Sequence, residues 1–513
     1  MSREVCRAGA IALTGLEGTA VMVEAAVSRQ LPGMAIIGLP DTALAEAKLR
    51  VRTASAQSGL PLSDHFITVN LQPADLPKQG SGFDLAIALA ALAASGRLPG
   101  TRLGETAHIG ELGLDGELRR PAGLLAATVS ARELGFRRVI VPEQGATEAA
   151  LVPGVEIVAA RDLAGAVAWH AGAAGAWRVV PPTPRQERRA AEEADMSDVI
   201  GQPEAVEALV IAASGGHHLS LLGPPGAGKT MLASRLPSIL PDLTQAESLT
   251  ASSIAALGGV PLGSLVDRPP FEAPHHTASA VSIIGGGDGA GVHAGAITRA
   301  CHGVLFLDEA PEFPRSVLDG LRQPLESGWI EIHRARLRTT LPARIQLVLA
   351  ANPCPCGNAG SPDTAAECRC SPATRVRYLQ RISGPLNDRI DLHLTVRRVS
   401  SALLGDAAAP TPSSAELRER VGRARLRATE RLRGTAWRVN SELPGTWLRS
   451  AAGRLTRADT AVLDRALARG ALTLRGYHRV LRLAWTIADL AELERPGREE
   501  IARALVLRGG GAP

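Results

Sequence analysis

The sequence predicts a protein of the α/β class that ends in a helical domain. Its 513 residues are enough for two to four domains, each with its own hydrophobic core. In the first third, short apolar strands alternate with Ala-rich helices, which is typical of α/β folds. In the middle, apolar strands carry polar residues at their ends, and the last hundred residues follow a helical pattern. We therefore expect two α/β domains followed by a helical domain.

The first α/β domain is expected to span residues 1–176. Its predicted strands lie at 20–27, 66–71 and 138–142, and its predicted helices at 44–59, 84–94 and 124–134. The following stretch, 177–196, contains Pro181-Pro182-Thr183-Pro184 and a charged run, so it is expected to be a linker. A second joint, rich in Ala, Pro and Ser, lies at 405–414.

The second α/β domain, predicted at 197–400, contains a phosphate-binding sequence. Residues 223–230 read GPPGAGKT and follow the apolar run 218–222, as a strand–loop–helix motif requires. Glycines in this pattern allow backbone N–H groups to surround phosphate oxygens at the start of a helix. The lysine of the motif contacts the β- and γ-phosphates, and the next hydroxyl binds Mg²⁺. The predicted nucleotide-binding residues are Gly223, Pro224, Pro225, Gly226, Ala227, Gly228, Lys229 and Thr230.

The use of lysine in this chain supports a true phosphate-binding loop over a simple tight turn. The chain has 56 basic residues, of which only Lys48, Lys78 and Lys229 are lysines. A compact ammonium group on a flexible stem suits phosphate better at this position than the planar guanidinium of arginine. A chain that uses arginine almost everywhere has kept a lysine here.

An acidic pair completes the predicted ATP-hydrolysis site. The four apolar residues Val304–Leu307 predict a buried parallel strand, followed by Asp308 and Glu309. These carboxylates would lie at the carboxyl edge of the sheet, where nucleotides bind in open α/β folds. We expect Asp308 to hold Mg²⁺ together with Thr230, and Glu309 to polarise the attacking water. The expected activity is ATP hydrolysis, with ATP and Mg²⁺ as cofactors.

Two further segments add to the predicted nucleotide-binding motifs. A buried strand at 345–351 ends in Asn352, and residues 384–391 read GPLNDRID. With the motifs above, this set resembles AAA+ ATPases. The resemblance implies that Asn352 is the first sensor, that Arg389 is an arginine finger for the nucleotide of a neighbouring subunit, and that Arg475 is the second sensor on a helical lid at 411–507. Each arginine taken alone would better suit a surface ion pair, and only the spacing of the two from the stronger motifs favours these roles.

Longer motifs narrow the resemblance to one family. They are FEAPHHTAS at 271–279, GGG at 285–287, LRQPLE at 321–326, NPCPCG at 352–357 and TIADL at 486–490. Together they resemble the magnesium-chelatase-like AAA+ family called ComM or YifB, over nearly the whole chain. The resemblance implies a hexameric, ring-shaped DNA helicase that drives branch migration when incoming DNA recombines during natural transformation. Its implied partners are single-stranded and branched DNA. Trp485 departs from the pattern, because an arginine is expected there.

The sequence leaves two other functions open. One is an ATPase subunit that drives metal insertion into a tetrapyrrole, as in true magnesium chelatases. The other is a protein-remodelling chaperone or a scaffold. The paired cysteines and the N-terminal domain are not expected in a chelatase motor subunit, which favours the helicase. Stimulation of ATP hydrolysis by DNA would separate these functions.

Positive charge is concentrated in the last fifth of the chain. From residue 411 onward there are 20 arginines against 11 acidic residues, a balance of +9 within a total of +5. The densest part, Arg418–Arg438, is predicted to be helical and would suit a nucleic-acid backbone, or equally a solvated surface. Residues 329–342 predict a hairpin with Arg334, Arg336 and Arg338 near its tip, which would suit a polymer in a central channel. An insertion is also expected at 274–295, and its adjacent His275 and His276 are poorly placed to share a metal.

Four of the six cysteines suggest a metal. Cys354-Pro355-Cys356 and Cys368-Arg369-Cys370 flank a loop that contains Gly357, Asn358, Gly360 and Pro362. Four thiolates from such a loop would form a closed structural zinc site. Reduced thiols with no metal are the alternative, and catalytic thiols are a weaker one.

The N-terminal domain is similar to the Lon protease domain, which has a ribosomal S5-like α/β fold and a Ser-Lys dyad. The similarity rests on residues 76–84, LPKQGSGFD, and 123–127, GLLAA. Alignment on the glycines places Gly82 at the nucleophile and Gly123 at the lysine, and a shift by one residue offers Ser81 without a nearby lysine. Nucleophilic catalysis needs both groups, so we expect an inactive protease fold.

The sequence gives no sign of a membrane segment. The first residues are charged, and the longest apolar run, 85–94, is too short to span a bilayer. We expect no membrane partner and a cytoplasmic location.

Overall fold

The computed structural model describes residues 5–28, 31–38, 41–73, 82–183, 194–288, 291–334, 337–359, 365–399 and 411–509. Ser81, Arg336, Gly360 and Pro362 lie outside the described residues, as do the side chains of Arg334 and Arg338. The chain divides into two compact units, which differ from a simple division along the sequence. The first contains Met1–Glu187, Gln245–Val266 and Glu331–Leu341, and the second contains the other residues. The domain boundaries expected from the sequence stay a prediction.

The first unit is built on an eight-stranded mixed sheet in the order β10-β9-β8-β5-β1-β2-β4-β3. The long strands β1 and β2 pair antiparallel, whereas β1, β5, β8 and β9 run parallel to their neighbours in that series. The strands are β1 (Cys6–Thr14), β2 (Glu17–Ser28), β3 (Gly33–Ile37), β4 (Phe66–Gln72), β5 (Thr106–His108), β8 (Arg138–Pro142), β9 (Glu156–Ala160) and β10 (Trp177–Val180), and a small ribbon pairs β6 (Glu111–Leu112) with β7 (Leu118–Arg119). The strands expected at 20–27, 66–71 and 138–142 are confirmed.

The helices of the first unit cover this sheet and bury its apolar residues. Helix α2 coincides with the expected helix at 84–94, and every residue from Asp84 to Ala93 is buried. Leu249 and Ala256, from a segment far along the chain, share a core with Leu124 and Leu125. The helices are α1 (Asp41–Gln57), α2 (Asp84–Ala94), α3 (Leu124–Glu133), α4 (Ala146–Ala149), α5 (Leu163–Ala171) and α8 (Gln245–Ala256).

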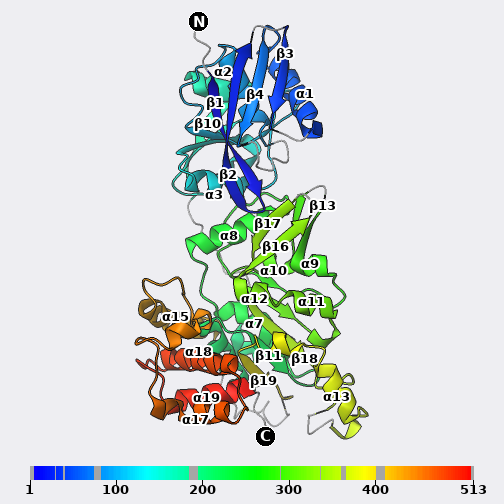
Figure 1. The fold of residues 1–513 in the computed structure, drawn as a ribbon, viewed down its shortest axis with the longest axis vertical. Helices are drawn as coiled ribbons and strands as arrows, with labels where there is room; N and C mark the ends of the chain where they lie inside the picture. The colour runs from blue at the N-terminus through cyan, green and yellow to red at the C-terminus, as the bar shows by residue number, and fades with distance from the viewer. Residues whose placement is uncertain are drawn as a thin grey trace. The chain divides into compact units, whose positions relative to one another are not determined.

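The second unit contains a five-stranded sheet in the order β12-β15-β18-β11-β19, and every neighbouring pair in it is parallel. The strands are β12 (Phe271–Glu272), β15 (Val304–Leu307), β18 (Gln346–Ala351), β11 (Leu219–Leu222) and β19 (Leu392–Thr395). The expected strands at 218–222, 304–307 and 345–351 therefore all belong to one sheet. Figure 1 shows β11, β18 and β19 as neighbours within this unit. All five carboxyl ends lie at the same edge.

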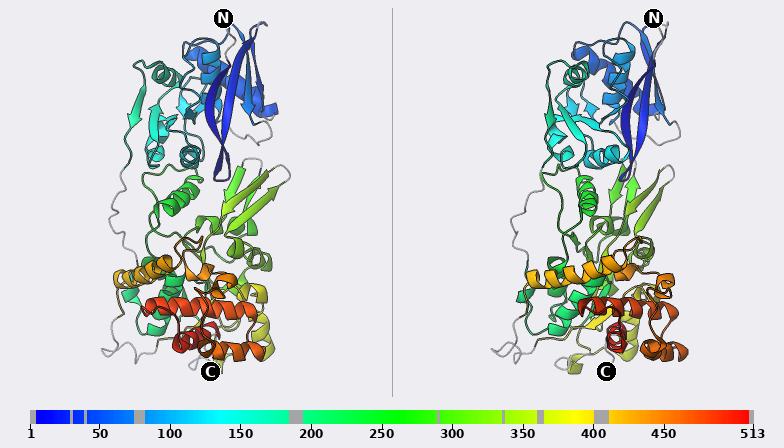
Figure 2. Two further views of the ribbon diagram at one scale, coloured as in Figure 1. Left: turned by 60° about the vertical axis from the view of Figure 1, so that its left-hand side comes forward. Right: turned by 90° about the vertical axis from the view of Figure 1, so that its left-hand side faces the viewer.

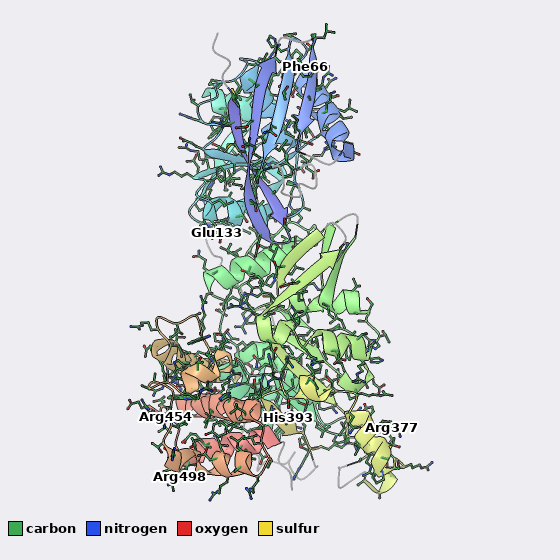
Figure 3. The ribbon with its side chains drawn as sticks, viewed as in Figure 1. Phe66, Glu133, Arg377, His393, Arg454 and Arg498 are labelled. Carbon is green, nitrogen blue, oxygen red and sulfur yellow. The ribbon has the colours of Figure 1, made fainter. Side chains whose placement is uncertain are left out.

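The second unit also contains helices and a hairpin. The helices before the C-terminal domain are α6 (Pro203–Gly215), α7 (Lys229–Ile239), α9 (Ala280–Ile284), α10 (Ala296–Arg299), α11 (Arg315–Gly320), α12 (Pro324–Ser327), α13 (Pro372–Leu379) and α14 (Gly384–Asn387). Strands β16 (Trp329–Arg334) and β17 (Leu337–Pro342) form the expected hairpin, and its segment Glu331–Leu341 belongs to the first unit. A second hairpin, β13 (Gly285–Asp288) with β14 (Gly291–Ala294), lies in the insertion at 274–295. Arg377 on α13 points away from the rest of the chain, as Figure 3 shows.

The C-terminal part is helical, as expected. It contains α15 (Ser414–Arg431), α16 (Gly445–Leu448), α17 (Arg457–Ala468), α18 (Leu474–Leu490) and α19 (Arg498–Gly509). A capping box begins α15, since the Ser413 side chain accepts from the Glu416 backbone and Glu416 accepts from that of Ser413. In both views of Figure 2 the orange and red helices α15, α18 and α19 form one layer. Among the described residues, no helix has the length and apolar character needed to cross a bilayer.

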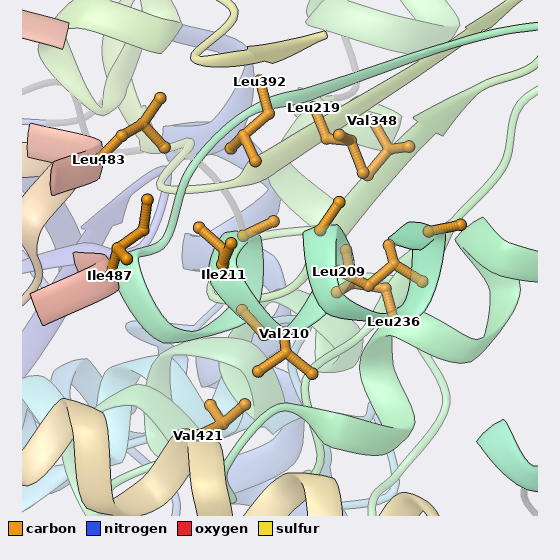
Figure 4. Packing of buried hydrophobic residues seen from close by; sticks show 14 of the residues in the cluster. Leu209, Val210, Ile211, Leu219, Leu236, Val348, Leu392, Val421, Leu483 and Ile487 are labelled. Atoms are coloured by element: carbon orange, nitrogen blue, oxygen red, sulfur yellow. The ribbon is translucent and has the colours of Figure 1, made fainter. Parts of the chain in front are cut away.

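One hydrophobic core joins the C-terminal helices to the five-stranded sheet. Figure 4 shows Ile211 of α6 between Leu392 of the sheet and Ile487 of α18. Leu209 of the same helix lies beneath Leu219 of the sheet and beside Leu236 of α7. Val210 on α6 faces Val421 of α15. Burying each such side chain contributes about 1.5 to 3 kcal/mol. Helix α6 therefore fixes the helical domain to the sheet.

Candidate nucleotide site

The parallel sheet of the second unit brings the predicted site residues together at one edge. The loop after β11 is the phosphate-binding sequence, Asp308 and Glu309 follow β15, and Asn352 follows β18. These three strands are adjacent in the sheet. Ligands bind at the carboxyl ends of strands in open α/β sheets because loops and helix N-termini meet there. Side chains that are 78 and 123 residues apart in sequence, Thr230 with Asp308 and Lys229 with Asn352, thus contribute to one site.

The phosphate-binding loop needs its glycines for conformation and for close packing. Gly226 and Gly228 have φ of 76° and 87°, the left-handed region that side chains disfavour. A Cβ atom on Gly223 would lie 2.2 Å from the Val396 carbonyl oxygen, so only glycine fits there. The Gln202 side chain donates to the Ala227 carbonyl at 2.8 Å and fixes the loop from behind. Helix α7 then begins at Lys229.

The Lys229 side chain folds back onto the start of this loop. Its Nζ atom donates to the carbonyl oxygens of Gly223 at 2.6 Å and Pro224 at 2.9 Å, and to Oδ1 of Asn352 at 3.0 Å. None of these acceptors is a carboxylate. Burial lowers the pKa of Lys229, while the charges of Asp308 and Glu309 oppose that shift. The hydrogen bonds of the ammonium group go to neutral oxygens, so an anionic ligand such as a phosphate would supply the negative charge. Lys229 also links the phosphate-binding loop to Asn352.

Thr230 and Asp308 form a pair of oxygen donors beside Lys229. The Thr230 hydroxyl donates to Oδ2 of Asp308 at 2.7 Å. Hydroxyl and carboxylate oxygens are hard ligands of the kind that Mg²⁺ prefers, usually with waters and phosphate oxygens completing its shell. The two residues therefore fit a magnesium ion held between protein and nucleotide.

Glu309 has an unusual backbone conformation. Its φ of 51° and ψ of 44° lie in the left-handed region, which is rare for a residue with a side chain. Its backbone N–H donates to Oδ1 of Asp308 at 2.9 Å, which stabilises this turn. Strain of this kind is concentrated at functional sites, where it aims a side chain that a relaxed strand would direct elsewhere.

His276 contacts the acidic pair, a connection that the sequence did not indicate. Its Nδ1 atom lies 3.2 Å from Oε2 of Glu309. The neighbouring His275 turns instead toward the Thr277 hydroxyl, with 2.8 Å between Nδ1 and Oγ1. The two imidazole rings lie 4.1 Å apart between their centroids, and each has its own contact. The only signal in the sequence was the pair of histidines itself, because nothing in it shows that residues 276 and 309 are neighbours.

The two predicted arginines meet at one carboxylate. Arg389 and Arg475 lie 2.5 Å and 3.5 Å from Oε1 of Glu326. Arg389 also donates to the Pro385 carbonyl at 2.7 Å and is only 7% exposed, whereas the Arg475 side chain is half exposed. Glu326 belongs to the LRQPLE motif, so this motif and the two arginines form one cluster.

A buried polar network lies directly behind Arg389. Arg479 of α18 donates to Oδ1 of Asp391 at 2.5 Å and to the Arg389 carbonyl at 2.8 Å. Burial would raise the pKa of Asp391, but the charge of Arg479 and the hydrogen bond from His217 lower it well below its usual range. Burial lowers the pKa of His218 to about 4, so this residue is neutral at pH 7. Arg479, which sequence reasoning missed, thus ties the C-terminal helices to the Arg389 turn.

The four predicted metal ligands also come together. The sulfur atoms of Cys354, Cys356, Cys368 and Cys370 all lie within 4.8 Å of one another. The backbone of Asn358 hydrogen-bonds Cys356 and lowers the pKa of its thiol to about 6.

The arginine-rich helix α15 is fixed to its own chain. It ends at Arg431, so Arg438 lies beyond it. Arg420 forms a two-bond ion pair with Glu207 at 2.6 and 2.9 Å, and Arg418 and Arg425 donate to the carbonyls of Ser238 and Ala213. Much of the basic run therefore anchors the helix, which favours the structural interpretation over a free phosphate-binding surface.

Trp485 stands where an arginine was expected, and its side chain is buried. It is 1% exposed, packs edge-on against Trp447 at 5.5 Å between ring centroids, and lies under the Arg431 guanidinium at 4.5 Å. Arg431 also pairs with Asp489 at 2.5 Å. A cation over an aromatic face contributes about 1 to 2 kcal/mol when it is desolvated. The position therefore belongs to the core.

In the first unit, glycines occupy both predicted dyad positions, and they have different surroundings. Gly82 faces open space, with no atom within 4 Å of an added Cβ. Gly123 has φ of 74°, and a Cβ there would lie 2.7 Å from Leu13. A lysine at residue 123 would be strained in backbone and packing alike.

Comparison with known proteins agrees with this architecture. The family described as "Magnesium chelatase, subunit ChlI" matches residues 195–404, its C-terminal domain matches 411–508, and "Subunit ChlI of Mg-chelatase" matches 23–145. The chain is 39% identical to YifB of Escherichia coli over 97% of its own length and 96% of YifB's. It is 39% identical to the competence protein ComM of Haemophilus influenzae, over 96% and 95% of the two lengths. The chain belongs to the magnesium-chelatase-like ComM/YifB family. An uncharacterized protein of Mycobacterium tuberculosis is 43% identical over 99% of both chains. This membership identifies the second unit as a ComM-like AAA+ motor.

Proposed function

We propose that this protein is an ATP-driven DNA motor, a hexameric ring that acts as a helicase and promotes branch migration during recombination of incoming DNA in the cytoplasm. The observation that carries the proposal is the convergence of Lys229, Thr230, Asp308, Glu309 and Asn352 at one edge of a parallel sheet. Family membership supports an ATPase, and the printed name of one relative, a competence protein, supports a role with DNA.

Each site residue has a role in this proposal. The backbone of residues 223–228 and the Lys229 ammonium bind the phosphates, and Thr230 and Asp308 hold Mg²⁺, which when bound neutralises phosphate charge and aligns the leaving group. Glu309 accepts a hydrogen bond from the attacking water and orients it. Asn352 fixes the other side of that water. His276 holds the Glu309 carboxylate in position.

The arginines act between subunits. Arg389 places positive charge beside the γ-phosphate of the neighbouring subunit, where it stabilises charge that develops in the transition state. Arg475 senses the nucleotide from the C-terminal helices. Because Arg389 is 7% exposed in the single chain, this role requires Glu326 to release the guanidinium when subunits assemble.

An ATPase assay with four separate additions tests this function. We expect single-stranded and branched DNA to stimulate hydrolysis, with no effect of an unfolded model protein or of a tetrapyrrole with Mg²⁺. Light scattering in the presence of ATP should give the mass of six chains. Stimulation by tetrapyrrole would instead assign the metal-insertion motor that the chelatase relationship offers, and stimulation by unfolded protein alone would assign a chaperone.

A further inference from the structure

Two C-x-C pairs form a compact group of four sulfur atoms in the second unit. The Sγ atom of Cys354 lies 3.3 Å from that of Cys356 and 3.8 Å from that of Cys368, and Cys356 and Cys368 are 3.6 Å apart. Cys370 completes the group within 4.8 Å. Cys354 is buried, whereas Cys356 is exposed.

These distances fit metal ligands better than any pairing of the thiols. A disulfide would require about 2.05 Å between sulfur atoms. A tetrahedral zinc ion with Zn–S bonds of about 2.3 Å separates its sulfur ligands by about 3.8 Å. The three sulfur–sulfur separations of 3.3, 3.8 and 3.6 Å lie near the second value, and four sulfur ligands leave no open position for a substrate. The arrangement is that of a closed structural site.

The backbone around the cysteines is shaped to hold such a site. Gly357 has φ of 80°, and its N–H donates to the Cys354 carbonyl at 3.0 Å, which closes a tight turn through the first pair. The Ala359 N–H points at the Cys354 sulfur at 3.4 Å. Arg375 donates to the Cys370 carbonyl at 3.2 Å and so fixes the second pair to helix α13. Hydrogen bonds of this kind orient metal ligands from outside the first coordination shell.

The same turn packs against the phosphate-binding loop. A Cβ atom on Gly357 would lie 2.6 Å from both Cδ and Cγ of Pro225, so the backbone of the turn touches that ring directly. Cys354 is two residues from Asn352, which bonds Lys229. The cysteine turn thus borders the nucleotide site at two points, through a proline ring and through strand β18.

We propose that the four cysteines bind one zinc ion, and that the metal holds the turn at Gly357 against Pro225 so that ATP affinity depends on zinc occupancy. The metal part stands apart from the motor activity, whereas the second part rests on the proposed ATP site. Without the metal, the link between the two C-x-C pairs is lost. The turn at Gly357 is then free to move away from Pro225, and the phosphate-binding loop loses that packing contact.

Metal analysis tests the first part. Protein purified without chelators should contain about one zinc per chain, and Cys354→Ser with Cys368→Ser should contain none. Cys6→Ser, which alters a cysteine of the first unit, is the matched control and should keep the zinc. Replacement by Co²⁺ should give the visible absorption bands of a tetrahedral cobalt–thiolate centre. Wild-type protein without metal, or zinc retained by the double variant, would overturn the proposal.

Binding of a fluorescent ATP analogue tests the second part. Chelation of zinc from the wild-type protein should weaken binding roughly tenfold or more, because the phosphate loop is displaced, and added zinc should restore it. Gly357→Ala keeps all four thiols, so it should retain zinc while weakening ATP binding by pushing on Pro225. Circular dichroism checks that each sample is folded. Unchanged ATP affinity in folded, zinc-free protein refutes the coupling and leaves the metal site intact. A failed motor proposal would appear separately, as zinc-loaded protein without DNA-stimulated hydrolysis.

Discussion

Buried polar groups are used differently in the two compact units. In the first unit they satisfy one another: Asp84 pairs with Arg50 at 2.7 Å, Glu148 pairs with Arg120 at 2.6 Å, and His108 bonds His170 at 2.9 Å. The second unit also contains a buried pair of this kind, Arg479 with Asp391. Its Lys229, in contrast, donates only to neutral oxygens, and Glu309 is held in a strained backbone conformation at one edge of the sheet. Charges paired internally stabilise a fold, whereas charges with neutral partners at a sheet edge are available to a ligand. The contrast teaches that the nucleotide chemistry belongs to the second unit.

The largest effects are expected from substitutions of Lys229, which would bind the phosphates, and of Glu309, which would orient the attacking water. Lys229→Ala should abolish measurable ATP binding, because it removes a buried cation from the phosphate position. Glu309→Gln should bind ATP normally but hydrolyse it roughly 10² to 10⁴ times more slowly, since only the water-orienting carboxylate is lost. Equilibrium binding and phosphate release separate the two variants. Hydrolysis at the parental rate by Glu309→Gln would show that the acidic strand is wrongly assigned.

Arg389→Ala tests whether the nucleotide site of one subunit needs an arginine from the neighbouring subunit. We expect a folded protein that binds ATP but hydrolyses it about 10³-fold more slowly, as for other arginine fingers. Mixing it with Lys229→Ala should restore part of the activity, because some subunit junctions then contain both intact residues. Arg423→Ala, on the surface of α15, is the matched control. If the two variants assemble together and mixing restores nothing, Arg389 does not act across an interface.

His276→Ala tests a smaller contribution within the same site. Loss of the contact to Glu309 should lower the hydrolysis rate about tenfold, within the range of supporting hydrogen bonds, and leave ATP affinity unchanged. His275→Ala removes an adjacent imidazole that turns toward Thr277, and it should keep the parental rate. Equal rates for the two variants would mean that the contact does not position Glu309.

Asp84→Ala tests whether the paired charges of the first unit serve stability and not nucleotide binding. Asp84 is 1% exposed, and its loss leaves Arg50 with the exposed Glu46, at 3.4 Å, in place of a buried carboxylate, which should destabilise the first unit by about 3 kcal/mol. ATP affinity should not change, because the nucleotide site lies in the other unit. Chemical denaturation followed by circular dichroism measures the first effect, and analogue binding measures the second. Weakened ATP binding in the folded variant would contradict the separation of roles.

The sequence predicted those parts of the fold that depend on short, strongly patterned segments. Val304–Leu307 and Asp84–Ala94 are apolar runs with clear ends, and both elements begin and end where expected. The positions of Lys229, Asp308 and Asn352 at one edge followed from the rule that parallel strands share a carboxyl edge. The contacts of His276 with Glu309 and of Arg479 with Asp391 did not follow, since they join distant segments through packing. The assignment of α8 to the first unit depends in the same way on long-range apolar contacts.

The shared core around α6 has a consequence for how the second unit folds. Val210, Val421 and Trp485 come from segments that read as separate domains, yet all belong to one hydrophobic cluster. Elements that share a core lose their structure together, so the sheet and the C-terminal helices form a single cooperative folding unit. A destabilising change in helix α18 would then unfold the phosphate-binding loop as well. Damage to these helices therefore removes whole subunits from the folded population.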